Sequence, residues 1–162
     1  MVASLSEEGK NKVDFAKIIE KANQSERDLM NLMAEDSKSF REVMKAYRMP
    51  KKTKKEKDQR QEKIQKALKY ATETPLNIAE NCCDLLCVCR KVAEYGNKNA
   101  ITDVGAAAIY ANAAAKAALL NVDINIISIN DKSYLKTAKK KRKKLEKLAS
   151  VKSETVLDLM RK

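Results

Sequence analysis

The stretch that decides the fold runs from Gly96 to Asn125 and reads GNKNAITDVGAAAIYANAAAKAALLNVDIN. It opens with a turn signal and passes through Thr102 and Asp103, which suit the start of a helix because a helix N-terminus favours capping side chains and negative charge. Nine alanines follow between positions 105 and 118. Such small side chains let a neighbouring helix approach closely. We therefore expect a helix that is central in a bundle, lies at a dimer interface, or does both.

The composition favours the all-α class. The chain has 162 residues, of which 44% are hydrophobic, enough to bury the core of one domain. It contains only three glycines and two prolines, whereas a β-sandwich or barrel needs many turns. We predict a single domain over residues 1–162, built as an up-and-down bundle of long helices, with a basic helix at about 133–162.

Charge and cysteine content limit the partners and the cellular compartment that the sequence is compatible with. The net charge of +12 indicates either an anionic partner or a solubility device. The N-terminal MVASLSEEG does not resemble a signal peptide, and the apolar region 104–129 carries too many polar residues for a membrane span. The four cysteines lie between positions 82 and 89, which is no disulfide framework and fits a reducing cytoplasm.

The chemistry available to the chain is limited by the absence of histidine. Ser-His and Cys-His nucleophile pairs are excluded. A structural zinc site needs four good ligands, and the usual CxxC spacing is missing, so we expect no metal. The cysteines are interpreted as small buried hydrophobic residues.

The first helix is predicted from about Asn11 to Tyr47, because apolar residues recur there at three- and four-residue steps. Asp36 lies seven residues after Leu29 and four before Phe40, so it falls on the predicted buried stripe. Burying an unpaired carboxylate is costly. Asp36 should therefore either form a salt bridge or cap with a neighbouring helix, or serve as a site carboxylate. The apolar stripe comprises Phe15, Ile18, Ile19, Ala22, Leu29, Leu32, Met33, Phe40, Val43, Met44 and Tyr47.

A second helix is predicted to begin near Thr53, since Glu56 follows at the spacing of a capping box. Pro75 either kinks this helix or starts a new one, and Gly96 ends it. The preceding loop, PKKTKKEKDQ at 50–59, is basic and lacks apolar residues. It is either a solvated loop or an electrostatic collar for an anionic ligand.

Polar residues recur at helical spacing in the alanine-rich helix. Asn112 and Lys116 are one turn apart, as are Asn121 and Asn125. Residues in such register form either a satisfied hydrogen-bond network or ligand contacts, and both interpretations stay open for Asn112, Lys116 and Asn121.

The last segment includes KTAKKKRKKLEKL at 136–148. It contains no aromatic residue, so a solvated face is favoured over a nucleic-acid helix. A break is expected near Ser150 to Ser153.

Seven short elements in order carry a resemblance over roughly residues 1–135. The chain resembles the cyclodeaminase/cyclohydrolase family, namely the C-terminal domain of formiminotransferase-cyclodeaminase and its stand-alone bacterial relatives, including methenyltetrahydrofolate cyclohydrolases. The elements are MVASLS at the start, Asp36-xxx-Phe40 with Ala46 and MPKKT, Arg60 with Ile64-Gln65, Ala71-xxx-Pro75-Leu76, Gly96-Asn97-x-Asn99, Thr102-Asp103-Val104-Gly105, and Asn121-Val-x-Ile-Asn125.

The resemblance implies a dimer with a folate site near its interface. The implied reaction cyclises 5-formimidoyltetrahydrofolate to 5,10-methenyltetrahydrofolate with loss of ammonia. The sister activity hydrolyses the methenyl compound to 10-formyltetrahydrofolate. Neither reaction needs a metal or a redox cofactor, and a formiminotransferase is a possible partner.

The resemblance also suggests site residues. Asp36 is expected to exchange the proton. Substrate contacts are expected from Arg60, Asn97, Asp103 and Asn125, and the anionic glutamate tail would be steered by Lys51, Lys52, Lys54 and Lys55.

The family pattern also includes a proline- and glycine-rich turn and an alanine-rich helix before the position that Met1 matches. We expect the lack of that segment to affect catalytic competence more than the fold. Two alternatives therefore remain, a non-catalytic relative that binds folate or a protein partner, and a basic helical nucleic-acid binder.

Overall fold

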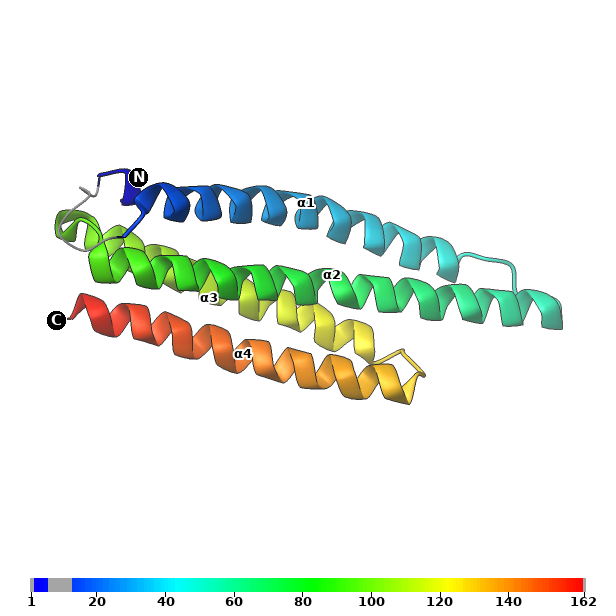
Figure 1. Ribbon diagram of the computed structural model, residues 1–162. Coiled ribbons are helices and arrows are strands. Elements are labelled where there is room, and N and C mark those ends of the chain that lie inside the picture. The colour runs from blue at the N-terminus through cyan, green and yellow to red at the C-terminus, as the bar shows by residue number, and fades with distance from the viewer. Residues whose placement is uncertain (1, 6–12, 162) are drawn as a thin grey trace.

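The computed structural model describes residues 2–5 and 13–161, and these fold into four long helices that run alternately up and down (Figure 1). The predicted helix start at Asn11, and Met1 and Ser6 of the MVASLS element, lie outside the described residues. The all-α, up-and-down prediction is confirmed. The helices are α1 (Phe15–Tyr47), α2 (Lys54–Tyr95), α3 (Ile101–Ile126) and α4 (Lys132–Met160), with short 3-10 turns at Ala3–Leu5 and Lys98–Ala100.

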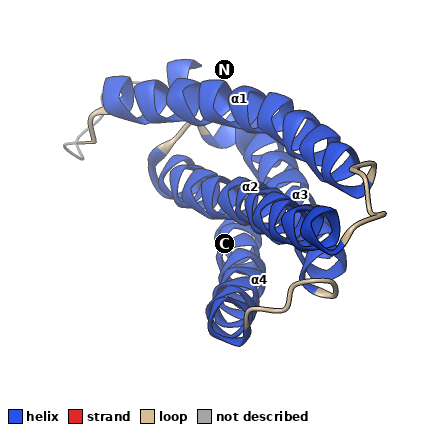
Figure 2. Cartoon of the chain, turned by 90° about the vertical axis from the view of Figure 1, so that its right-hand side faces the viewer, coloured by secondary structure: helices blue, strands red, loops and turns tan. Residues whose placement is uncertain are grey.

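The centre of the bundle is α2. This helix packs against α1, α3 and α4, whereas the alanine-rich α3 packs against α2 and α4. Figure 2 shows α1 on one side of α2 and α4 on the other. The central position that the sequence suggested for α3 is therefore held by α2, which at 42 residues is long enough to contact all three neighbours. The fully buried Ala108 and Ala115 still allow α3 its close contacts.

Local capping signals set most helix starts. Thr53 and Glu56 form the predicted capping box at the start of α2. Asp14 accepts a hydrogen bond from the Lys17 backbone N–H at 3.1 Å, and Asp131 caps α4 in the same way. At the end of α2 the Gly96 N–H donates to the Val92 carbonyl at 2.8 Å, as expected for a helix terminus.

Of the two alternatives at Pro75, the start of a new helix is wrong, because α2 continues through this residue. The break predicted near Ser150 to Ser153 is also wrong. α4 continues past Ser150 and Ser153 to Met160. Ser153 is buried, and its hydroxyl donates to the Ala108 carbonyl of α3 at 3.3 Å. Because that polar group finds a partner inside the bundle, it does not end the helix.

The core contains three of the four cysteines. Cys82, Cys83 and Cys89 are buried in the main apolar cluster with Leu76 and Leu86, while Cys87 is exposed. The prediction of buried hydrophobic cysteines is thus confirmed for three positions and wrong for Cys87.

The buried face of α1 is narrower than its apolar pattern. Met33 and Phe40 are 67% and 64% exposed, while Ser39 is buried and donates to the Asp36 carbonyl at 2.8 Å. α1 packs mainly on one helix, α2, so only one stripe of its surface is covered. The buried residues of α1 are Phe15, Ile18, Ser39, Val43 and Ala46.

No helix among the described residues has the length and apolar content that crossing a membrane requires.

Candidate functional site

Polar side chains from the three outer helices meet α2 within the segment 69–75. We call this set the polar girdle. Most of its members are half-buried, and together their interactions join α2 to α1, to α3 and to the start of α4. The members are Glu35 of α1, Lys69, Tyr70 and Glu73 of α2, Asn125 of α3, Asp131 before α4, and Tyr134 of α4.

Pro75 explains why Asn125 is needed in the girdle. A proline inside a helix has no N–H to donate to the carbonyl four residues earlier, which here is that of Ala71. The Asn125 side-chain amide donates to the Ala71 carbonyl at 2.7 Å. Asn125 therefore supplies the hydrogen bond that Pro75 removes, and α2 continues without a break.

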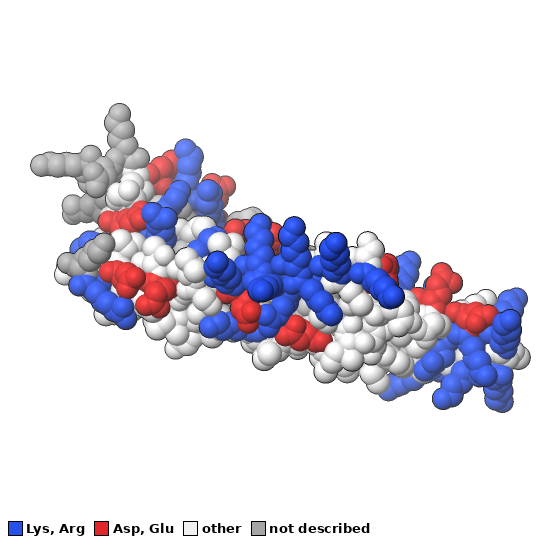
Figure 3. Space-filling view, turned by 90° about the horizontal axis from the view of Figure 1, so that it is seen from below, with Lys and Arg blue, Asp and Glu red and all other residues white. Residues whose placement is uncertain are grey.

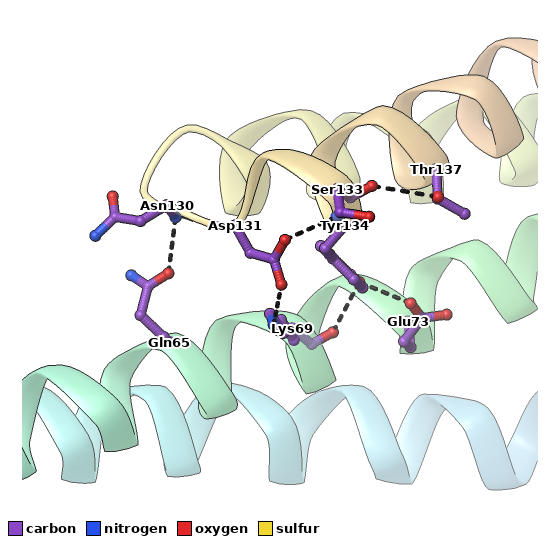
Figure 4. Close-up of polar contacts among 8 residues, drawn as sticks. All are labelled: Gln65, Lys69, Glu73, Asn130, Asp131, Ser133, Tyr134 and Thr137. Atoms are coloured by element: carbon purple, nitrogen blue, oxygen red, sulfur yellow. Dashed lines mark hydrogen bonds and ion pairs between the residues drawn. The ribbon is translucent and has the colours of Figure 1, made fainter.

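Figure 4 shows how the girdle fastens the start of α4 to α2. The Tyr134 hydroxyl donates to the Glu73 carboxylate at 2.7 Å, and its oxygen also lies 3.2 Å from the Lys69 carbonyl oxygen, so the single proton is shared unequally between them. The Lys69 ammonium pairs with Asp131 at 2.7 Å and lies 5.4 Å from the centre of the Tyr134 ring. One turn earlier on α2, Gln65 accepts from the Asn130 backbone N–H at 2.7 Å.

These contacts shift two pKa values in opposite directions. Burial, together with the hydrogen bond to Glu73, raises the pKa of Tyr134 well above its usual range. The hydrogen bond from Lys69 lowers the pKa of Asp131. Both pKa shifts favour the protonation states that the girdle contacts need at neutral pH, namely a neutral Tyr134 phenol and an ionised Asp131 carboxylate.

Asp36 lies beside the girdle but takes no part in it. Its neighbour Glu35 accepts a hydrogen bond from the Tyr70 hydroxyl and lies 3.7 Å from the Lys38 ammonium. The half-buried Asp36 carboxylate makes no hydrogen bond or ion pair with any residue that the structure describes. Of these two carboxylates, Glu35 therefore makes the contact with the neighbouring helix, a hydrogen bond to α2, while its ion pair stays within α1. The role of Asp36 as a site carboxylate stays a prediction.

Arg60 and the four lysines at 51, 52, 54 and 55 lie together at the connection between α1 and α2. The Arg60 guanidinium donates to the Tyr47 carbonyl at 3.0 and 3.3 Å and stands 5.7 Å from the centre of the Tyr47 ring. It thereby satisfies a carbonyl at the C-terminus of α1. Exposed side chains surround this turn at Lys51, Lys52, Lys54 and Lys55.

Asn97 and Asp103 lie at the opposite end of the bundle. The Asn97 side chain accepts from the Asn99 backbone N–H at 3.0 Å and so shapes the turn before α3. Asp103, in the first turn of α3, lines a mainly apolar cavity of about 270 Å³ between α1, α2 and α3.

The predicted site residues therefore fall into two groups in one chain. Asp103 and Asn125 are separated by 22 residues of one continuous helix, which is roughly 33 Å at 1.5 Å per residue. Asp36 in the second half of α1, Arg60 near the start of α2 and Asn125 near the end of α3 lie toward one end of the bundle. Asn97 and Asp103, between α2 and α3 and at the start of α3, lie at the other. A compact ligand in one copy of the chain cannot contact both groups.

Sequence reasoning missed an exposed apolar stripe on α3, which we call the α3 stripe. Its members recur at alternating four- and three-residue steps, the spacing of a helix seam. Tyr110 is 74% exposed, Leu120 66%, Ile124 65% and Ile127 75%. The stripe comprises Ala106, Tyr110, Ala113, Ala117, Leu120, Ile124 and Ile127.

The total accessible surface is also large. It measures 10718 Å², whereas a compact monomer of 18.2 kDa exposes roughly 8,100 Å². The elongated bundle therefore leaves uncovered a surface of the size that stable protein interfaces bury.

The four long helices and the absence of strands among the described residues define an all-helical bundle domain. Residues 1–144 match the family model described as formiminotransferase-cyclodeaminase. The chain belongs to this family.

Individual relatives agree with that assignment. The chain is 38% identical over 135 residues to the methenyltetrahydrofolate cyclohydrolase of Methylorubrum extorquens, covering 83% of this chain and 64% of that protein. It is 29% identical over 145 residues to the formimidoyltransferase-cyclodeaminase of Gallus gallus, covering 90% of this chain and 27% of that protein. The chain thus spans less than two thirds of the length of these relatives.

A solved structure shares the fold over nearly the whole chain. The crystal structure of formiminotetrahydrofolate cyclodeaminase from Thermotoga maritima superimposes with a TM-score of 0.87 at 26% identity. The match covers 99% of this chain and 78% of that one.

Proposed function

We propose that the protein acts on tetrahydrofolate carrying a one-carbon unit, at the step that closes or opens the 5,10-methenyl bridge. The observation that carries the proposal is that the activities for which its relatives are named all involve this bridge. The solved neighbour is named a cyclodeaminase. The 38% identical relative is named a methenyltetrahydrofolate cyclohydrolase.

Cyclodeamination is the first candidate. The folate N10 attacks the formimidoyl carbon on N5 and forms the new C–N bond, and the N10 proton is transferred to the former imine nitrogen. That nitrogen takes up one further proton, its C–N bond breaks, and ammonia leaves. A carboxylate that exchanges this proton beside the reacting carbon lowers the barrier. Asp36, half-buried and without a partner among the described residues, is our candidate for that role.

Cyclohydrolysis is the second candidate, favoured by the relative from Methylorubrum extorquens. Water adds to the methenyl carbon, the C–N5 bond breaks, and one proton is released as 10-formyltetrahydrofolate forms. The same carboxylate would remove the proton from water. The two reactions therefore differ in substrate rather than in the protein group required.

The anionic end of the substrate has a matching basic surface at the end of α1, the helix that carries Asp36. The lysines at 51, 52, 54 and 55 and the Arg60 guanidinium surround the turn that follows α1. We propose that they attract the glutamate tail, which raises the rate of substrate capture at low salt.

A second copy of the chain completes the arrangement in our proposal, with the two α3 stripes packed antiparallel. The first half of the stripe is mostly small, with Ala106 and Ala113, and the second half is bulky. Antiparallel pairing about an axis between positions 116 and 117 sets Ala113 against the partner's Leu120 and Ala106 against the partner's Ile127, while Tyr110 meets the partner's Ile124. A parallel pairing would instead set every bulky residue against its own copy.

The antiparallel pairing would also join the two groups of site residues. With the two-fold axis near position 117, Asp103 lies roughly 8 Å along the helix axis from the partner's Asn125, compared with about 33 Å within one chain. The site would then be assembled from both copies.

Absorbance of the methenyl bridge tests the proposed function. Mixed with 5-formimidoyltetrahydrofolate, the protein should make the methenyl band appear faster than a blank does; mixed with methenyltetrahydrofolate, a cyclohydrolase should make it disappear faster. Asp36→Asn should lose the activity while keeping its helical circular dichroism. Glu20→Gln, an exposed carboxylate change on the same helix, should not. Acceleration of neither reaction at micromolar protein would refute the proposal, and an active Asp36→Asn would refute the role of Asp36.

A further inference from the structure

α4 carries a dense row of exposed lysines that the folate reaction does not use. We call it the lysine ridge. Between positions 136 and 147 the only other residue that is exposed is Thr137. Figure 3 shows cationic side chains crowded along this side of the molecule. The ridge consists of Lys136, Lys139, Lys140, Lys143, Lys144 and Lys147.

The ridge differs from the other cations of the same segment. Lys141 pairs with Glu80 of α2 at 2.8 Å, and Arg142 pairs with Asp123 of α3 at 2.8 Å and also with Glu146. These neighbouring carboxylates are therefore engaged by cations beside the packed side of α4. None of the six ridge lysines makes an ion pair or hydrogen bond within residues 2–5 and 13–161.

The spacing of the ridge lysines spreads their side chains over one face of α4 and brings like charges close together. At 100° per residue, the six side chains occupy an arc of about 140° over a length of roughly 17 Å. Four lysine pairs stand at i and i+4, where like charges destabilise a helix. An anionic partner would relieve this repulsion.

We propose that the lysine ridge binds the phosphate backbone of duplex DNA without regard to sequence, and that α4 lies along the major groove. α4 forms an edge of the bundle, on the far side of α2 from α1 (Figure 2). A helix is 10–12 Å across with its side chains, and the B-DNA major groove is about 12 Å wide. Lysines on both flanks of the ridge can then reach phosphates on both walls of the groove.

The composition of the ridge argues against other polyanions. Single-stranded nucleic acid is usually held by aromatic side chains that stack on bases, and the ridge has none. The major groove of duplex RNA is too narrow and deep for a helix. Adsorption of a helix to a membrane uses an apolar face, but Ala138, Leu145 and Ala149 of α4 are buried in the bundle. With no arginine or amide on the ridge, base-specific contacts are also not expected.

Fluorescence anisotropy with a labelled mixed-sequence duplex of about two helical turns tests the proposal. Affinity should fall linearly with the logarithm of salt concentration, with a slope of about −4 to −5 for four to six phosphate contacts. Replacing Lys139, Lys140, Lys143 and Lys144 by Gln should weaken binding at least tenfold at low salt and make the slope shallower by about three to four. The corresponding Lys→Arg variant should bind as the parent does.

A variant with the same loss of charge elsewhere is the matched control. Gln at 51, 52, 54 and 55 also removes four lysines, which lie just before and at the start of α2 rather than on α4. This variant should bind duplex DNA with an affinity within about threefold of that of the parent. Equal losses in the two Gln variants would mean that only net charge matters and would overturn the ridge as a site. Absence of duplex binding at low salt, or equal binding of single strands, duplex RNA or phosphatidylserine vesicles, would also overturn it. Circular dichroism of each variant establishes that the helices remain.

Discussion

The polar girdle and the α3 stripe differ in how far their contacts are completed within one copy of the chain. In the girdle, the Asn125 amide, the Tyr134 hydroxyl and the Lys69 ammonium each have a partner within the chain. In the α3 stripe, bulky apolar residues such as Tyr110 and Ile127 have most of their surface uncovered. The polar contacts of the girdle are thus made within one copy, while the apolar side chains of the α3 stripe stay largely uncovered.

This difference separates two kinds of dependence. Unpaired polar groups in a bundle cost stability directly, so changes in the girdle should act on folding. Exposed apolar side chains contribute little to the folding free energy of the monomer, and they contribute to the free energy of association when a partner covers them. Changes in the stripe should therefore act on assembly, and through assembly on the proposed site.

The largest expected effect is at Leu120, near the middle of the stripe. Leu120→Asp would bury an unpaired carboxylate at the proposed interface, which costs about 3–5 kcal/mol. Association should weaken at least about 100-fold, and the mass measured by light scattering should fall to that of one chain. The methenyl-forming activity should fall with it, because the proposed site needs both copies.

A matched change on another helix controls for the added charge. Val151 of α4 is 54% exposed and lies outside the stripe, so Val151→Asp should leave mass and activity unchanged. Both variants should keep the helical signal of the parent. A dimeric mass for Leu120→Asp would show that the stripe is not the interface.

Sequence reasoning predicted the elements that depend on local signals. The capping box at Thr53 and the end of α2 at Gly96 involve neighbours in the chain, and both are confirmed. The continuity of α2 through Pro75 was not predictable in that way, because the compensating donor, Asn125, lies 54 residues from the carbonyl it satisfies. The continuity of α4 past Ser153 likewise depends on a carbonyl of α3.

The candidate site was predictable only as a set of residue types. The periodicity of α1 placed Asp36 on an apolar stripe, but periodicity does not reveal which part of a stripe a neighbour covers. Met33 and Phe40 are exposed as a result, and Asp36 is only half-buried. The sequence also gave no distance between Asp103 and Asn125, which the unbroken α3 sets at roughly 33 Å. Their roles toward a substrate remain predictions.

A moderate effect is expected at Asn125, within the girdle. Asn125→Leu leaves the Ala71 carbonyl without its donor and should lower the free energy of unfolding by about 1–3 kcal/mol in urea titrations. In a Pro75→Ala background the backbone N–H of residue 75 can satisfy that carbonyl, so the same change should cost much less. A double-mutant cycle measures this coupling.

The cycle also separates folding from substrate contact. Asn31→Leu, at an exposed asparagine of α1, should cost within about 0.5 kcal/mol. If the Asn125 and Pro75 changes are additive, the proposed compensation is wrong. If the double variant is stable but inactive, Asn125 has a role toward substrate beyond the girdle.

The smallest effect is expected at Tyr134, where the girdle can be weakened by pH. Tyr134→Phe removes the hydroxyl that donates to Glu73 and should cost about 1 kcal/mol at pH 8. Because the folded pKa of Tyr134 is raised, the unfolded chain loses this proton first as pH passes about 10, so the stability that the phenol contributes declines above that pH. Burial also raises the pKa of Cys82 and Cys89 to about 11, but these thiols titrate alike in both proteins and cancel in the difference. The gap in unfolding free energy between parent and variant should therefore shrink between pH 8 and pH 11, and a gap independent of pH would contradict the hydrogen bond as the source of the stability.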